Sequence, residues 1–273
     1  DFSHLSLTKV NSHFSKIKLI EKGVACTIDK LNLREKSGFI LDTLMADAQV
    51  SHLGISTQGL KLTTPNSSVR GNVSFATKEY KDLANFIEDV KIKSDFVPTK
   101  VNFKDISYFA PTLEGVNKWI SFNGEIKGTV DNLKARKFSF ITDDGTRFKG
   151  KTDISGLPNM DDVFMYVDVK EFITTKERVE TFPMYPFKEN NKIQLPDNFR
   201  HLGAVRFKGN FTGFYHDFVA YGTVKTGLGN ITTDVSLKLN NGNPRYTGKI
   251  AAQKFNIGKF FENSKNFETS SIP

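Results

Sequence analysis

Apolar and polar residues alternate with a period of two along much of this chain, and the pattern is clearest between Val205 and Asn240. Phe207 and Phe211 fall on one side of this stretch, whereas Arg206 and Lys208 fall on the other. Successive side chains of a β-strand point to opposite faces of the sheet, so the alternation predicts strands with one apolar and one solvated face. Similar runs recur along the chain, at residues 15–20, 24–33, 38–50, 59–64, 68–76, 100–108, 119–130, 133–142, 146–154, 163–173, 203–212, 216–226, 229–239 and 245–256.

Turn residues separate most of these runs, which predicts a mainly β fold. Asn, Asp and Gly fill the breaks, because Gly and Asn tolerate positive φ and Asx side chains close turns. Two segments depart from the period of two. Residues 78–90 have apolar side chains at helical spacing and predict a short amphipathic helix. Residues 181–198 contain Pro183, Pro186 and Pro196 and predict a long loop between two blocks of strands.

The chain contains a diverged internal repeat. The stretch ISFNGEIKGTVDNLKA from Ile120 aligns with VRFKGNFTGFYHDFVA from Val205, so that Phe122 matches Phe207. The two copies begin 85 residues apart. A β-sheet unit that repeats in this way predicts an extended structure and not a globule. Glycines also lie in register with the apolar row, at Gly124, Gly128, Gly209 and Gly213. Glycine inside a strand marks a bend or a close approach of another group, which fits a sheet curled into a trough and fits bent strands around a dry core equally well.

Composition narrows the kind of partner. The aromatic residues are 25 Phe against 7 Tyr and 1 Trp, which favours an apolar surface over one that stacks on sugars or bases. The net charge of +8 suits an anionic partner, although a solvated lysine-rich face explains it more simply. The lysines are spread among apolar residues, so the sequence predicts no basic cluster and no nucleic-acid partner.

Two further features concern the chain as a whole. Its single cysteine, Cys26, excludes an internal disulfide and is expected to pack as a small apolar residue. The chain begins at Asp1 and has no apolar run of about 18 residues. We therefore expect one continuous segment, residues 1–273, from the interior of a longer protein.

No catalytic or metal-binding motif is present in the sequence. The five histidines are scattered, and the pairs Asp143-Asp144 and Asp161-Asp162 lie in turn-like sequence, which is typical of solvated turns. The Gly-Leu-Gly triplet at 227–229 precedes a strand and not a helix, so it does not predict a phosphate-binding loop. The sequence predicts a protein that is not an enzyme and has no cofactor or metal.

Three blocks of the chain carry a family resemblance. They are SGFILDTLMADAQVSHLGISTQGLKLTTPNSSVRG (37–71), the run YFAPTLEG…ISFNGEIKGTVDNLKA, and LGAVRFKGNFTGFYHDFVAYGTVKTGLGNITTDVSLKL…YTGKIAAQKFNIGKF. Together they resemble Bacteroidetes TamB proteins, the translocation and assembly module subunits of the AsmA-like superfamily. The resemblance spans nearly the whole chain through the order of its blocks, while each block alone is weakly specific.

The resemblance implies a fold and a cellular role. The fold is a long, strongly curved β-sheet, a U-shaped β-taco trough with an apolar concave face and one or two short helices. The role is that of a periplasmic bridge, which carries phospholipid between the inner and outer membranes. The implied partners are phospholipids, a TamA-like outer-membrane barrel protein, and the inner membrane through an N-terminal anchor outside this segment.

In-register alternation predicts which side chains line the trough, and glycine gaps among them would set its width, at Gly124, Gly128, Gly209 and Gly213. The predicted lining residues are Ile120, Phe122, Ile126, Phe138, Phe140, Phe207, Phe211, Val224, Val235, Leu237, Ile250 and Phe255. Bound phospholipid would then be the only ligand expected.

Two alternatives and one modification site remain open. The second hypothesis is a scaffold that assists outer-membrane protein assembly by pairing strand edges. A β-helical, adhesin-like protein with a dry core is the third possibility. Separately, Asp42-Thr43-Leu44 resembles the O-glycosylation signal of Bacteroidetes periplasmic proteins and predicts a glycan on Thr43.

Overall fold

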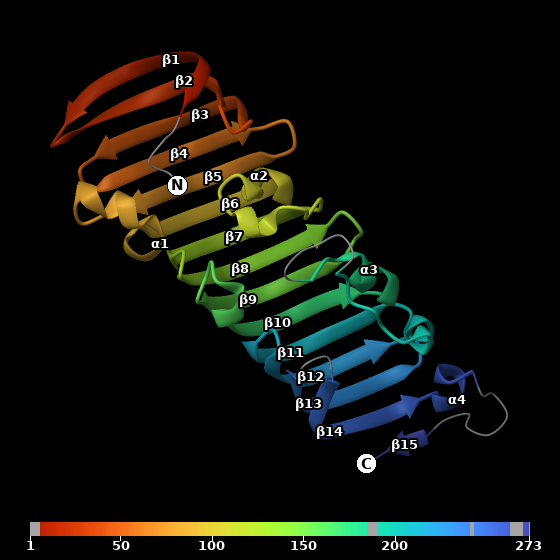
Figure 1. Cartoon of the computed structure of the whole chain (residues 1–273). Coiled ribbons are helices and arrows are strands. Elements are labelled where there is room, and N and C mark those ends of the chain that lie inside the picture. Colours follow the sequence, from red (N-terminus) through yellow and green to blue (C-terminus); the bar gives the residue numbers. More distant parts are fainter. Residues whose placement is uncertain (1–5, 185–190, 241–242, 263–269, 273) are drawn as a thin grey trace. The chain divides into compact units, whose positions relative to one another are not determined.

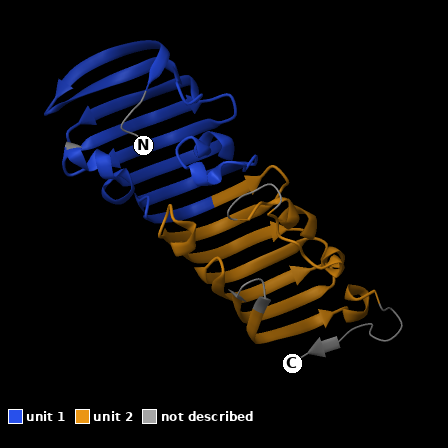
Figure 2. Ribbon diagram, viewed as in Figure 1, with its two compact units in different colours: residues 1–138 blue, residues 139–273 orange. Residues whose placement is uncertain are grey.

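A computed structural model describes residues 6–184, 191–240, 243–262 and 270–272. The chain divides into two compact units, unit 1 (Asp1–Phe138) and unit 2 (Ser139–Pro273), shown in Figure 2. Strands hold 64% of the described residues and helical segments 15%, so the mainly β prediction is confirmed.

Unit 1 is built from consecutive antiparallel strands, and each strand pairs with the next one in sequence (Figure 1). This order follows from short turns between alternating segments, since two antiparallel strands need only a few residues to connect them. The strands are β1 (Leu7–Ile20), β2 (Gly23–Glu35), β3 (Ile40–Ser51), β4 (Gly54–Thr63), β5 (Ser68–Ala76), β6 (Lys91–Asn102) and β7 (Trp119–Thr129), followed by the first part of β8 (Asn132–Thr142).

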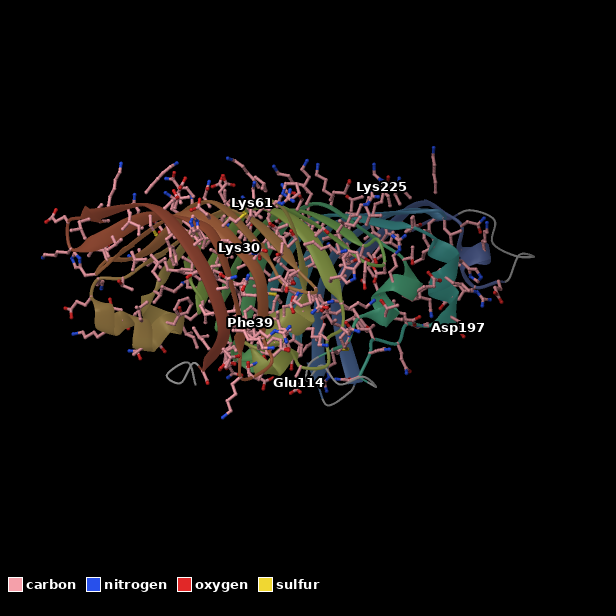
Figure 3. The ribbon with its side chains drawn as sticks, turned by 90° about the horizontal axis from the view of Figure 1, so that it is seen from above. Lys30, Phe39, Lys61, Glu114, Asp197 and Lys225 are labelled. Carbon is pink, nitrogen blue, oxygen red and sulfur yellow. The ribbon has the colours of Figure 1, made fainter. Side chains whose placement is uncertain are left out.

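Unit 2 repeats this arrangement with the end of β8 and the strands after it. Among the described residues of either unit, the first and last strands do not pair with each other. Figure 3 shows that the strands of each unit are bowed; Lys61 lies on the outer side in unit 1, and Lys225 lies on the outer side in unit 2. The strands are β9 (Arg147–Ser155), β10 (Phe164–Thr174), β11 (Val205–Phe214), β12 (Asp217–Thr226), β13 (Gly229–Asn240), β14 (Asn243–Phe255) and β15 (Ser270–Ile272).

Short helical segments lie in the connections between strands, and they outnumber the one or two predicted. The segment at 78–90 is a 3-10 helix, η1 (Tyr80–Asn85), that runs into one turn of α-helix, α1 (Phe86–Asp89). The predicted loop at 181–198 starts where α3 ends and reaches the start of η4, while residues 185–190 lie outside the described residues. The other segments are α2 (Phe103–Ser107), η2 (Pro111–Leu113), η3 (Met160–Asp162), α3 (Lys176–Thr181), η4 (Asp197–Leu202) and α4 (Ile257–Phe260).

Capping residues explain three helices that the period of two did not reveal. The strand predicted at 100–108 ends at Asn102, whose side-chain oxygen accepts a hydrogen bond from the backbone N–H of Lys104 and starts α2. Thr175 starts α3 and Asn256 starts α4 in the same way. Asn and Thr side chains satisfy backbone donors that the first turn of a helix leaves unpaired.

Candidate functional site

The apolar side chains of unit 2 gather on one face of the sheet, which we call the inner face. The strand register decides this, because residues directly opposite in an antiparallel pair share a face. Phe207 lies opposite Val224, and Phe211 lies opposite Ala220, which in turn lies opposite Val235. Leu237 belongs to the same face, since it lies opposite Phe218 of β12.

The predicted lining residues of unit 1 also share one face. Ile120, Phe122 and Ile126 alternate along β7, where they lie opposite Val101, Thr99 and Ser94 of β6. The Phe122 ring packs against that of Phe138 on β8, with centroids 5.7 Å apart. We call this the inner face of unit 1.

Aromatic contacts tie the inner-face strands to one another. In unit 2 the rings of Phe140 and Phe148 stack at 5.2 Å, and those of Phe211 and Phe218 lie 4.5 Å apart. Phe148 lies opposite Phe172, which lies opposite Phe207. Such pairs contribute roughly 0.5–1.5 kcal/mol each beyond the burial of their area.

The middle of this face is not covered by a second layer among the described residues. Phe207, Phe211, Val224, Val235 and Leu237 are all only half-buried. Apolar side chains in a sandwich core would be almost fully buried, because a second sheet packs on them. The inner face is therefore a half-exposed apolar surface.

Two predicted lining residues differ from the rest. Ile250 is on the same face, opposite Thr233, but its exposed fraction is 60%. Phe255 is only 6% exposed, because it belongs to a small buried cluster with Leu202, Leu228 and Ala252. There η4 and α4 cover the ends of the last strands, so Phe255 lies in a local core.

The four glycines predicted to set the groove width have a backbone role in the structure. All have positive φ, between 120° and 158°. A Cβ on Gly213 would lie 2.3 Å from the carbonyl oxygen of Asp217 and 2.7 Å from the Cα of Phe218, both on the neighbouring strand. The other three would meet neighbouring backbone in the same way, at Gly124, Gly128 and Gly209. These glycines allow the strands to approach and bend, since only glycine has no Cβ.

Helices beside the inner face are fastened by buried polar contacts. Asp105 of α2 is buried and accepts hydrogen bonds from the hydroxyls of Thr64 and Ser67, both at 2.5 Å, and from the Asn66 amide at 3.0 Å. The Ser67 hydroxyl oxygen accepts the backbone N–H of Asn102 as well. This network holds α2 against the turn between β4 and β5.

A similar fastening in unit 2 involves Asp144, which sequence analysis treated as a solvated turn residue. Its carboxylate accepts hydrogen bonds from the hydroxyls of Thr142 and Thr181 and from the backbone N–H of Thr146. Burial of the carboxyl opposes ionisation, but these hydrogen bonds outweigh it and lower the pKa of Asp144 to about 2. The Thr181 contact ties α3 to the β8–β9 turn.

Asp144 should make the stability of unit 2 depend on pH. Because its pKa is lower in the folded state, its contribution is present above the usual Asp pKa near 4 and is lost as the pH falls toward about 2. We expect Asp144→Asn to lower the free energy of unfolding by about 1–2 kcal/mol at pH 7 and to flatten its decline at acid pH. Urea unfolding at several pH values tests this, with Asp143→Asn as the control. An equal slope for the variant and the wild type would contradict it.

Thr43, the predicted glycosylation site, lies within β3 opposite Thr63 and is half-buried. Its neighbour Asp42 is exposed. O-glycosylation of Thr43 stays a prediction.

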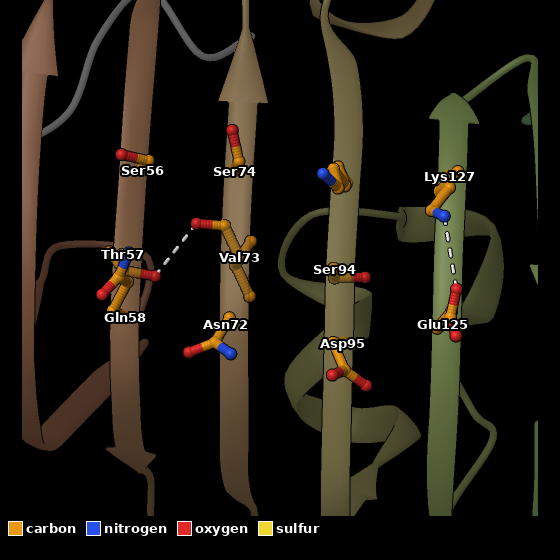
Figure 4. A pocket seen from close by; sticks show the side chains of 11 residues that line it. Ser56, Thr57, Gln58, Asn72, Val73, Ser74, Ser94, Asp95, Glu125 and Lys127 are labelled. Carbon is orange, nitrogen blue, oxygen red and sulfur yellow. Dashed lines mark hydrogen bonds and ion pairs between the residues drawn. The ribbon is translucent and has the colours of Figure 1, made fainter.

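The opposite, outer face of unit 1 bears a polar hollow that sequence analysis did not find. It has a volume of about 630 Å³ and lies over β4 to β7 (Figure 4). Glu125 and Asp95 lie directly opposite each other there. Hydrogen bonds from Lys137 and Lys127 lower the pKa of Glu125, so these lysines offset the repulsion between the two acids. Sequence analysis could not detect this hollow, because its residues are far apart in the sequence and only strand pairing brings them together.

Comparison with known proteins adds no relative: no family model, curated protein or solved structure matches the chain. None of the helical segments in the described part has the length and apolar character of a transmembrane helix.

Proposed function

We propose that the inner faces carry the acyl chains of phospholipids, and that the chain is a segment of a periplasmic lipid bridge of the TamB type. The observation that carries the proposal is an apolar, Phe-rich face left half-exposed at Phe207, Phe211 and Leu237. A surface of this kind marks a binding site, because exposed apolar area costs free energy unless a partner covers it.

The even character of the face favours transport over storage. Each methylene that leaves water contributes about 0.8 kcal/mol, and a row of similar side chains gives nearly the same gain at successive positions. A lipid held in this way has no single deep site to escape from. On this proposal the protein acts without catalysis, in the periplasm, between an inner-membrane anchor outside the segment and a TamA-like partner.

Native mass spectrometry of the purified chain tests the proposal. We expect adducts with the masses of phospholipids, which detergent removes and added phospholipid restores. Cys26 supplies a second readout, because it is the only cysteine and lies on the inner face of unit 1, opposite Ala48. A polarity-sensitive dye on Cys26 should report a drier environment when lipid is added. A protein that stays free of lipid in both measurements would contradict the proposal.

A further inference from the structure

Strand pairing gathers cations on the outer face of unit 2 that are far apart in the sequence. Arg206 of β11 lies directly opposite Lys225 of β12, and both Arg206 and Arg147 of β9 lie opposite Ile173 of β10. These residues form one row across the strands. A second row starts two residues further along, with Lys149 and Lys208. With Lys170 from the irregular part of β10, the group has six cations, which we call the basic face: Arg147, Lys149, Lys170, Arg206, Lys208 and Lys225.

The basic face is exposed, and one acid, Glu171, lies directly opposite Lys149 across the sheet. All six side chains are exposed, and none has an ion-pair partner in the described part of the chain. Two other outer-face cations are paired, Lys151 with Asp168 and Lys238 with Asp217. Like charges directly opposite across two strands destabilise a sheet. The repulsion between Arg206 and Lys225 therefore lowers the stability of the folded sheet. An anionic partner that binds there would offset this repulsion.

The surroundings of the basic face indicate the kind of partner. Tyr221 lies on the outer face of β12 and is 58% exposed. It is two residues away from Thr223, which lies opposite Lys208 of the basic face. Val219, another two residues on, is 46% exposed. Tyrosine and aliphatic side chains beside lysines are typical of the boundary between headgroups and acyl chains. A valine has no π face on which a base can stack, so the combination favours a lipid surface over a nucleic acid.

We propose that the basic face docks on the surface of a phospholipid bilayer that carries anionic headgroups. It lies on the opposite side of the sheet from the inner face, so it would hold unit 2 at a membrane without covering the proposed lipid path. Each cation near an anionic bilayer attracts it independently, and salt weakens the attraction within a Debye length. The inference does not depend on the proposed lipid transport.

Vesicle flotation tests the docking. The intact chain is mixed with vesicles of phosphatidylcholine alone or with phosphatidylglycerol added. The variant Arg206→Glu/Lys208→Glu/Lys225→Glu is compared with a matched control, Lys30→Glu/Lys61→Glu/Arg70→Glu, which changes the net charge equally on exposed residues of unit 1. We expect binding to the anionic vesicles only, lowered about a hundredfold in the first variant and nearly unchanged in the control.

Several results would overturn the proposal. Equal losses in both variants would mean that net charge alone drives binding, and equal binding to neutral vesicles would mean uptake of lipid without docking. A single-stranded RNA probe is the third arm. RNA binding that is tighter than vesicle binding, and is lost in the same variant, would make nucleic acid the partner. Thermal melts of both variants should match the wild type, since all six substituted side chains are exposed.

Discussion

Replacing Phe211 with aspartate, or Leu237 with arginine, is expected to abolish phospholipid binding while leaving unit 2 folded. Both side chains lie on the inner face and are half-buried. A charge placed beside acyl chains loses hydration without gaining a partner, which costs several kcal/mol. At about 1.4 kcal/mol for each factor of ten, affinity should fall a hundredfold or more.

Folding should suffer much less, because water reaches this face when no lipid is bound. The empty protein can hydrate the new charge, so the penalty falls on the loaded state. In a dry core the same charge would be buried without a partner and would unfold the unit. The expected fall in Tm is roughly 5 °C, from the lost packing of Phe211 on Phe218.

The measurement pairs a titration with fluorescent phospholipid and a thermal melt of each variant. Ser236→Arg is the matched control for Leu237→Arg, since Ser236 is the next residue on β13 and lies opposite Val219 on the outer face. It should bind lipid like the wild type. A collapsed melt for the inner-face variants would show an ordinary core, and unchanged lipid binding would remove the inner face from the lipid path.

Much of the fold could be predicted because alternation is a local property of the sequence. The runs at 203–212 and 216–226 correspond closely to β11 and β12, and their residues face as expected. β-Bulges limit this kind of prediction. In β10, Val169 and Phe172 both pair with inner-face positions, Gly209 and Phe207, although they are three positions apart, an odd number. A bulge inserts an extra residue into a strand. Alternation counted from one end of the strand therefore predicts the wrong face of the sheet at the other end.

The parts that could not be predicted depend on which strands pair and on what covers their ends. Phe255 departs from the alternation that Ile250 and Ala252 follow, because the register of β14 shifts between Ala252 and Phe255. The connections that bury Phe255, η4 and α4, come from segments without a period of two. The sequence also predicted no basic cluster, because Arg147 and Arg206 lie far apart along the chain. Pairing places both opposite Ile173. Registers between strands decide such clusters, and register is not a local property.

Gly213→Ala is expected to be among the most destabilising single substitutions in unit 2. Gly213 has φ of +138°, and the new methyl group would lie 2.3 Å from the carbonyl oxygen of Asp217. That oxygen belongs to the paired strand β12, so relief requires the β11–β12 hairpin to open or shift. We expect a loss of at least about 3 kcal/mol in the free energy of unfolding, from backbone strain and steric overlap together.

Gly59→Ala separates the two causes, and the internal repeat supplies a second test. Gly59 also has positive φ, +60°, but a Cβ there would have no atom within 4 Å. It should therefore lose only about 1–2 kcal/mol, the cost of a left-handed backbone. Gly128, the repeat equivalent of Gly213, would place a Cβ 2.0 Å from the carbonyl oxygen of Asn132 and should lose as much as Gly213. Urea unfolding of the three variants measures these differences. If Gly213→Ala and Gly128→Ala lowered the free energy of unfolding no more than Gly59→Ala does, close approach of the strands would not be the reason for these glycines. The prediction that they set the width of the groove would then be the remaining explanation.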